Sequence, residues 1–259
     1  MKELNAIFTI AYRDVIKLLR DRTRLIAGFI FPVIFIGALG GSLQANLGSS
    51  AGFNFLAFVF TGVLAQTLFQ STASGIISLI EDRENDFSQE IFVSPVSRYT
   101  IILGKILGES LVASVNALGV LAFGLIVGVR LDPFQIAALI PVALFSCLLG
   151  GAFGVLVLSQ LPSQRSANQI FPFLIFPQFF LSGAFSPVQH LPWYLLIFSR
   201  LAPMTYAVDF TRSLLYWGHP DYSKVVIYGP LIDITIIAIL FTIMLIIGTY
   251  FFVKNERNK

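Results

Sequence analysis

Residues 55–90 read "FLAFVFTGVLAQTLFQSTASGIISLIEDRENDFSQE", and the two parts of this stretch differ sharply in chemistry. Residues 55–80 carry no charged side chain, and about 20 apolar residues are enough for a helix to cross the hydrocarbon of a bilayer. Five of the chain's 14 acidic residues then follow between Glu81 and Glu90. The stretch predicts a membrane span that ends in a charged loop.

The composition of the whole chain agrees with this prediction. The 259 residues are 56% hydrophobic and 12% charged, with a mean hydropathy of +0.82. These values exclude an ordinary soluble domain and indicate an all-α integral membrane protein. The single cysteine, Cys147, excludes a disulfide framework, and His190 and His219 have no second ligand at metal spacing, so no metal site is expected.

Six segments are long and apolar enough to be predicted as transmembrane helices. The fifth contains Pro172 and Pro177, which a membrane helix tolerates when neighbouring groups satisfy the freed carbonyls. The whole chain, residues 1–259, is expected to form one transmembrane domain. The predicted spans are residues 25–45, 55–80, 100–129, 134–158, 168–186 and 229–253.

Two further helical features are predicted outside the spans. Residues 3–22 place apolar side chains at helical spacing beside several charges, which favours an amphipathic helix in the membrane interface. Residues 187–228 contain two apolar segments too short to span a bilayer, with Pro192 and Pro203 where a first helical turn tolerates proline. We expect an outer re-entrant helical hairpin there.

The basic residues predict the orientation. With a cytoplasmic N-terminus, 13 of the 17 Lys and Arg residues fall on the cytoplasmic side and four on the other. This asymmetry obeys the positive-inside rule. Six spans then return the C-terminus to the cytoplasm, so we expect a multi-pass protein of the plasma (cytoplasmic) membrane with both termini inside and residues 187–228 outside.

The acidic loop has an internal order of its own. Phe87 and Ile91 share one side of a short helix predicted at residues 84–96, which ends at Ser94 and Pro95. Apolar side chains exposed on a charged helix favour contact with a partner surface. The alternative is a charged loop that is merely solvated.

Two segments resemble the ABC-2 type permeases, the membrane subunits of ATP-driven exporters. Residues 81–107, "EDRENDFSQEIFVSPVSRYTIILGKIL", are similar to the family's E-x-E/R-x-G-T-x-E-x-L-x-x-x-P-x-S-R segment. Residues 180–215, "FLSGAFSPVQHLPWYLLIFSRLAPMTYAVDFTRSLL", are similar to its L-S-G-x-x-x-P-x-x-x-L-P and N-P-x-T-Y-x-x-D-x-x-R runs. The chain departs from the pattern at Asp86 and Phe87, where Gly-Thr is usual, and at Ala202, where Asn is common.

The resemblance implies that the helix at 84–96 is a coupling helix, which docks onto a separate ATP-hydrolysing subunit. ATP and Mg²⁺ would bind to that subunit, because this chain has no G-x-x-x-x-G-K-[ST] loop and needs no cofactor of its own. The implied partners are two ATPase copies, a second permease chain, identical or related, and membrane lipid, but no nucleic acid. The residues assigned to coupling are Glu81, Arg83, Glu84, Phe87, Glu90, Ile91, Pro95 and Arg98.

Polar side chains inside the second span are candidates for the transport pathway. Amides and hydroxyls are costly in lipid, so this face is expected to point at other helices or at water. The alternative is that they hydrogen-bond within the bundle or to their own helix. A phenylalanine stripe in the fifth span could contact a hydrophobic cargo, although packing or lipid contact is the favoured explanation. The candidates are Gln66, Thr67, Gln70, Ser71, Ser74, Phe173, Phe176 and Phe180.

Charged and amide residues near the span ends suggest specific pairings. Lys105 and Glu109 lie four residues apart and are expected to form an ion pair. Asn116, deeper in the same span, is expected to bond a neighbouring helix. In the hairpin, Arg200, Asp209 and Arg212 suggest an ionic outer gate, with a solvated rim as the alternative.

The function that this pattern favours is export of a lipophilic molecule such as a drug, an antibiotic or a lipid. Export of a polysaccharide or glycolipid is the alternative, since related permeases carry such cargo. An intramembrane enzyme would need convergent catalytic groups at depth, and none is expected. An ion-coupled secondary transporter would need acidic or carbonyl ligands at the midplane, which the spans also lack.

Overall fold

The computed structural model describes residues 2–84 and 97–257, and every regular element within them is helical. In chain order these are α1 (Lys2–Arg20), α2 (Arg22–Ile34), the π-helix η1 (Phe35–Gly40), α3 (Gly41–Ala51), α4 (Phe55–Gly75), α5 (Ile77–Glu84), α7 (Arg98–Val127), α8 (Pro133–Leu158), α9 (Gln164–Leu181), the 3₁₀ helix η2 (Val188–His190), α10 (Trp193–Leu201), α11 (Pro203–Leu215), α12 (Tyr222–Val225) and α13 (Pro230–Arg257).

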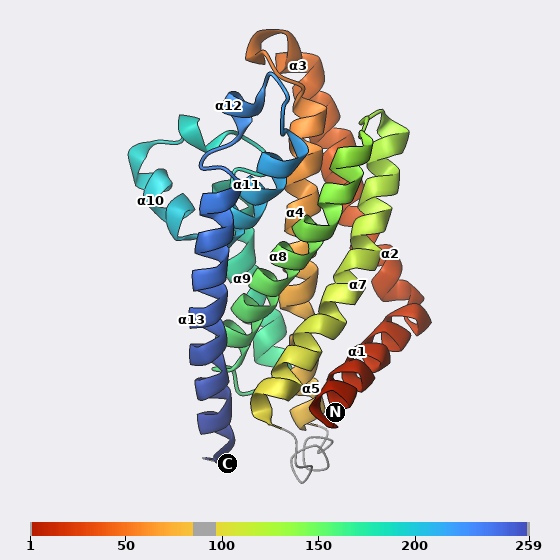
Figure 1. The fold of residues 1–259 in the computed structure, drawn as a ribbon, viewed down its shortest axis with the longest axis vertical. Helices are drawn as coiled ribbons and strands as arrows, with labels where there is room; N and C mark the ends of the chain where they lie inside the picture. Colours follow the sequence, from red (N-terminus) through yellow and green to blue (C-terminus); the bar gives the residue numbers. More distant parts are fainter. Residues whose placement is uncertain (1, 85–96, 258–259) are drawn as a thin grey trace.

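The chain runs back and forth along one helical bundle. The passes are α2 to α3, α4 to α5, α7, α8, α9 and α13, and Figure 1 shows both termini at the same end. We call this the terminal end. The opposite end carries α10, α11 and α12 and is called the hairpin end.

Five helical segments among the described residues are long and apolar enough to cross a membrane. They are Gly28–Asn46, Phe55–Glu81, Arg98–Val127, Pro133–Leu158 and Tyr222–Asn255. Each corresponds to a predicted span. The fifth predicted span folds as α9, but polar residues such as Arg165, Asn168 and Gln169 occupy its first turns. The sixth crossing therefore stays a prediction, although α9 does make a pass along the bundle (Figure 1).

Helix α4 is the centre of the bundle. In its most apolar stretch 78% of the residues are buried, whereas the corresponding share is 17% for the first pass and 22% for the last. Two glycines let α8 approach its backbone. A Cβ at Gly150 would lie 2.2 Å from the carbonyl oxygen of Phe69, and one at Gly154 would lie 2.6 Å from that of Ala73. Any larger residue would push the two helices apart.

The residues predicted as a re-entrant hairpin fold into short helices. Pro203 is the first residue of α11, where its missing N–H costs no hydrogen bond. Asp132 caps α8 in a capping box with Gln135. The Gln135 side-chain amide also donates to the carbonyl of Leu215 at 2.6 Å, which ties α8 to the end of α11.

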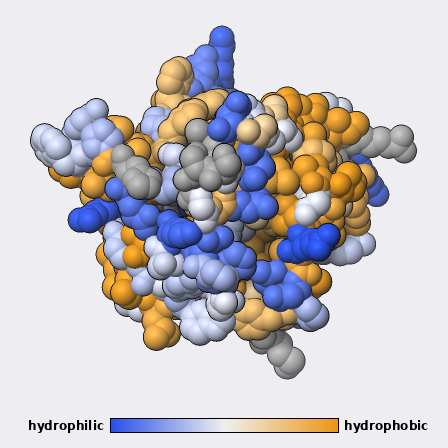
Figure 2. Space-filling view, turned by 90° about the horizontal axis from the view of Figure 1, so that it is seen from above, coloured by the Kyte–Doolittle hydropathy of each residue, from blue (hydrophilic) through white to orange (hydrophobic). Residues whose placement is uncertain are grey.

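The surface follows the pattern expected for a bundle surrounded by lipid. Seen along the bundle in Figure 2, hydrophobic residues occupy much of the rim, while hydrophilic residues cover the middle of the end face. Large apolar side chains point outward from several passes, among them Ile126 at 81% exposure and Leu231 at 80%. An aqueous surface rarely exposes so many, so these side chains are suited to contact lipid.

Candidate functional site

A groove of mixed polarity lies between the first pass, α4, α7 and α9. One cavity has a volume of about 300 Å³ and adjoins a second of about 260 Å³. The two share Gln70, Ser74, Phe176 and Phe179. The larger cavity is lined by Gly28, Phe31, Pro32, Thr67, Gln70, Ser71, Ser74, Asn116, Phe176 and Phe179. We call the two cavities together the polar groove.

Five of the eight predicted pathway residues line the polar groove: Thr67, Gln70, Ser71, Ser74 and Phe176. The other three do not. Gln66 is 1% exposed and buried in the bundle, while Phe173 and Phe180 project outward at 80% and 61% exposure. The α-helical period alone did not distinguish Phe176, which faces the groove, from Phe173 and Phe180, because these three rings lie within two turns of α9.

The polar groups of the groove are only partly satisfied. The hydroxyls of Thr67 and Ser74 donate to carbonyls of their own helix, at 2.8 and 3.1 Å. The amide of Asn116 donates to the Ser71 hydroxyl at 3.0 Å, which confirms the predicted bond to a neighbouring helix. The Gln70 amide makes no hydrogen bond to any residue that the structure describes. It is therefore available to a ligand or to water.

The first pass contributes an irregular backbone beside the groove. Pro32 has no N–H to donate within its helix, and the chain changes to π geometry from Phe35 to Gly40. Short π segments interrupt α-helices most often at functional sites. The rings of Phe31 and Phe179 meet across the groove with centroids 5.5 Å apart.

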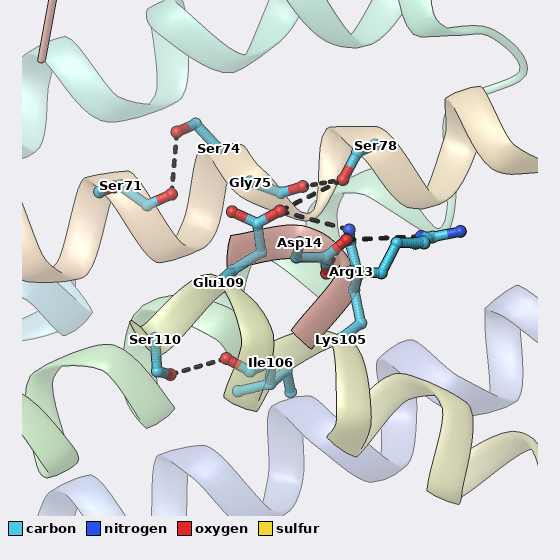
Figure 3. A network of polar contacts seen from close by, with 10 residues as sticks. All are labelled: Arg13, Asp14, Ser71, Ser74, Gly75, Ser78, Lys105, Ile106, Glu109 and Ser110. Atoms are coloured by element: carbon cyan, nitrogen blue, oxygen red, sulfur yellow. Dashed lines mark hydrogen bonds and ion pairs between the residues drawn. The ribbon is translucent and has the colours of Figure 1, made fainter. Parts of the chain in front are cut away.

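A buried ion network joins three helices near the terminal end (Figure 3). Lys105 Nζ on α7 lies 2.7 Å from Asp14 Oδ2 on α1 and 3.3 Å from Glu109 Oε1. The pair predicted between Lys105 and Glu109 is thus confirmed. Ser78 on α5 donates to Glu109 Oε1 at 3.4 Å, so the network also reaches the end of the second pass.

The network is dry, and glycines make room for it. The three charged side chains are at most 2% exposed. A Cβ at Gly108 would lie 2.9 Å from Asp14 Oδ2, and one at Gly75 would lie 2.0 Å from Glu109 Oε2. Burial strengthens these ion pairs but makes any unpaired member costly. The arrangement therefore fixes α1 against α7 and against the start of α5.

Asp14 was not recognised from the sequence as part of this network. It lies between Ala11 and Leu18, both buried, so it occupies the apolar side of α1. A single acid on an apolar helical face is a signal that a buried partner exists. The segment predicted as an interfacial helix at residues 3–22 contains α1, which covers Lys2–Arg20, and its place in the membrane interface stays a prediction.

The predicted coupling residues surround a segment that lies outside the described residues. Phe87, Glu90, Ile91 and Pro95 fall within 85–96, so their prediction is not addressed by the structure. The flanking residues are described. Glu81 is partly exposed on α5, which continues through Arg83 and ends at Glu84. Arg98 is the first residue of α7, and its side chain is partly exposed.

The three predicted gate residues have different environments at the hairpin end. Arg200 is exposed on α10, whereas Asp209 and Arg212 are each 1% exposed on α11. No hydrogen bond or ion pair joins Arg200 to Asp209 within the part of the chain that the structure describes. Asp209 instead accepts hydrogen bonds from the backbone N–H groups of Ile227 and Tyr228, at 2.7 and 2.8 Å.

Arg212 acts as a buried cross-link. Its guanidinium lies 3.6 Å from the centre of the Phe58 ring and donates to the carbonyls of Ala184 and Phe58 at 3.2 and 3.4 Å. Burial lowers the pKa of Arg212 to about 10, so the side chain remains charged at neutral pH. Burial raises the pKa of Asp209, while its two N–H donors and Arg212 act in the opposite direction.

The described residues form no metal centre. Across residues 2–84 and 97–257, no three His, Cys, Asp or Glu side chains gather as metal ligands do. Cys147 is buried, and burial makes a thiol inert. The features with functional chemistry are thus the polar groove, the ion network and the hairpin end.

Removal of Lys105 is expected to destabilise the protein strongly. The change Lys105→Met removes the buried cation that joins Asp14 to Glu109, while Arg13, 3.4 Å from Asp14, stays in place. Removing one partner of a buried ion pair costs about 3–5 kcal/mol. Thermal unfolding of the purified chain in detergent measures this loss. Adding Asp14→Asn is expected to recover part of it, so the two changes together cost less than their sum.

The control for this prediction is Lys224→Met. Lys224 pairs with Asp221 at 3.3 Å, but its side chain is 50% exposed. An exposed pair contributes about 1 kcal/mol or less. Equal losses for Lys105→Met and Lys224→Met would show that the network does not hold α1 in place.

Comparison with known proteins agrees with this arrangement. The ABC-2 type transporter family matches residues 5–216, which include both segments that resemble the family. The chain is 28% identical over 219 residues to the transport permease ycf38 of Cyanophora paradoxa, covering 82% of this chain and 74% of that protein. It is 25% identical over 191 residues to nodulation protein J of Rhizobium leguminosarum bv. trifolii, covering 73% and 72%.

A shorter match connects the chain to a drug transporter. The multidrug ABC transporter permease YbhR of Escherichia coli (strain K12) is 27% identical over 143 residues, covering 53% of this chain and 38% of YbhR. The family match extends from α1 to the end of α11 and so includes the groove, the network, and α10 and α11 of the hairpin end. This chain belongs to the ABC-2 type transporter family and is a membrane-embedded transport permease.

Proposed function

We propose that this chain is the permease subunit of an ATP-driven exporter and supplies one half of the pathway for a lipophilic molecule. The observation that carries the proposal is the polar groove, a cavity lined by the amides of Gln70 and Asn116 and the hydroxyl of Ser71 in a bundle whose surface carries many exposed apolar side chains. ATP and Mg²⁺ bind to a separate ATPase subunit in this proposal, two copies of which serve one transporter.

A second permease chain, identical or related, completes the pathway. A polar groove that faced lipid would leave the Gln70 amide without a hydrogen-bond partner, which is costly in hydrocarbon. A facing copy of the same groove would enclose these groups in a shared, wetter space. The proposed dimer thus follows from the cost of leaving the groove open.

The lining favours an amphipathic cargo. Rings of Phe31, Phe176 and Phe179 offer apolar contact, while Gln70 and Ser74 offer hydrogen bonds on the opposite side. Pockets of this mixed kind suit a largely apolar molecule with a few polar groups. The name of the relative YbhR, a multidrug permease, supports a drug-like cargo. Export of a polysaccharide or glycolipid is the alternative, and a screen for compounds that stimulate ATP hydrolysis distinguishes the two.

Replacing polar groups of the groove is expected to weaken cargo recognition but not assembly. Gln70→Leu with Ser74→Leu removes hydrogen-bonding groups worth about 0.5–1.5 kcal/mol each. The two groups together contribute about 1–3 kcal/mol, so the concentration of cargo that half-maximally stimulates ATP hydrolysis is expected to rise by about fivefold to 150-fold in the reconstituted transporter.

The matched control for the groove replaces exposed hydroxyls on another face. Thr235 and Thr242 on α13 are exposed and donate to their own helix at 2.8 Å. Thr235→Leu with Thr242→Leu is expected to leave the stimulation unchanged. If the control pair alters stimulation as much as the groove pair, the groove is not the cargo site.

The segment at residues 84–96 is proposed as the contact with the ATPase. The ion network supports this role, because it fixes α1, α5 and α7 directly beside the two points where the segment leaves and rejoins the bundle. A push on the segment would then move rigid helices, and the bundle would switch between inward and outward openings.

Truncation of the apolar residues in this segment is expected to release the ATPase. Phe87→Ala with Ile91→Ala removes two contact side chains at a cost of about 2–4 kcal/mol. Co-purification of the ATPase with the permease measures the loss. Phe198→Ala, which removes a 58% exposed ring at the hairpin end, is the control and is expected to keep the ATPase bound.

Retention of the ATPase by the double variant would place the contact elsewhere. Cargo movement that persists without any ATPase subunit would favour an ion-coupled transporter instead.

The terminal end is proposed to face the cytoplasm. The support is the asymmetry of 13 basic residues against four. In a Cys147→Ser background, a membrane-impermeant thiol reagent is expected to label a cysteine placed at His219 in intact cells, but not one placed at Lys254. His219 and Lys254 are both exposed and lie at opposite ends of the bundle. The reverse labelling pattern would invert the orientation.

A further inference from the structure

Two acidic side chains meet at the hairpin end, away from the polar groove. Asp209 comes from α11 and is 1% exposed, and Asp233 comes from the first turn of α13 and is 0% exposed. Helix α11 packs against α13, and this contact brings the two carboxyl groups within hydrogen-bonding reach of each other. Two carboxylates cannot hydrogen-bond, because an ionised carboxylate only accepts.

The two acids have unlike surroundings. Asp209 accepts one hydrogen bond on each oxygen, from the backbone N–H groups of Ile227 and Tyr228. Neither oxygen of Asp233 receives a hydrogen bond from any donor in the described parts of the chain. The first turn of a helix favours negative charge, but here it directs no N–H at the Asp233 carboxyl group. Of the two, Asp209 is thus the one arranged to remain ionised.

Among the described residues, no ion pair joins a cation to Asp233. The buried Arg212 lies on the Phe58 ring, donates to the Ala184 carbonyl and acts on Asp209. The other ionisable groups around the pair are the hydroxyls of Tyr206, Tyr222 and Tyr228, from α11, α12 and the turn before α13. Helices α4 and α8, which also pack against α11, contain no ionisable side chain except Cys147.

We propose that Asp209 and Asp233 form a binding site for one proton, which Asp233 carries and donates in a hydrogen bond to Asp209. With the proton bound, Asp233 is a hydrogen-bond donor and Asp209 an acceptor, whereas without it both carboxylates can only accept. Asp209 also holds the backbone at Ile227 and Tyr228. The proton therefore links α11, the turn before α13 and α13 itself, and its loss places two negative charges side by side.

This site is independent of the proposed transport function, since it needs only the contact between α11 and α13. Its first test is infrared spectroscopy of the purified full-length chain in detergent at neutral pH. A protonated carboxylic acid has a carbonyl stretch that a carboxylate lacks. The wild-type spectrum is expected to contain this band, Asp233→Asn to lose it, and Asp233→Glu, which keeps an acid at the position, to retain it.

The second test is the pH dependence of thermal unfolding. Unfolded aspartates lose their protons near pH 4, whereas the folded pair keeps one to higher pH. The wild type is therefore expected to lose stability as pH rises from about 5 to 9, with its melting temperature falling by about 3 °C or more relative to Asp233→Asn. The asparagine variant keeps a donor to Asp209 at every pH.

Asp132→Asn is the matched control. Asp132 is an acid at the same end of the bundle, it caps α8, and asparagine caps a helix equally well. This variant is expected to keep both the infrared band and the wild-type pH dependence. The proposal is overturned if the wild type lacks the band at neutral pH, or if Asp233→Asn and the wild type share one band and one pH profile. A stability that rises with added sodium ions while the band is absent would identify a cation site instead.

Discussion

Polar groups buried in an apolar bundle need partners, and this requirement organises the structure. Lys105 is the clearest case, since its ammonium group has two carboxylates within 3.3 Å and almost no contact with solvent. The ion pairs fix the angle at which α1 approaches α7. Positions 75 and 108 are glycines, and a side chain at either would collide with the carboxyl group of Glu109 or Asp14. Helix α1 is thus held by charge as much as by apolar contact.

The two ends of the bundle stabilise their buried charges in different ways. At the terminal end, opposite charges neutralise each other. At the hairpin end, Arg212 lies on an aromatic ring and Asp209 on backbone N–H groups, so the charges are stabilised by dipoles and quadrupoles. The polar groove lies between the two ends, and the amide of Gln70 there makes no hydrogen bond to any residue that the structure describes.

Much of this architecture was predictable because it depends on properties that act locally along the chain. Five spans follow from length and hydropathy, α1 from its amphipathic period, and the Lys105–Glu109 pair from a spacing of four residues. Interactions between distant segments were not predictable. Asp14 meets Lys105 across 91 positions, and Asp209 reaches Ile227 and Tyr228 only once α11 has packed beside α13. The predicted ionic gate of Arg200, Asp209 and Arg212 assumed a register between two helices that local sequence does not contain.

The π segment at Phe35–Gly40 changes the direction in which the side chains of the following helix point. A π turn holds more residues than an α turn, so each inserted residue rotates everything after it by about 100° about the helix axis. The apolar stripe that begins on α2 therefore does not continue on the same side in α3. The rotation decides where Gln44 points, and its side-chain oxygen accepts the N–H of Phe55 at 2.7 Å, at the very start of α4. One irregular turn thereby sets the corner at which the central helix enters the bundle.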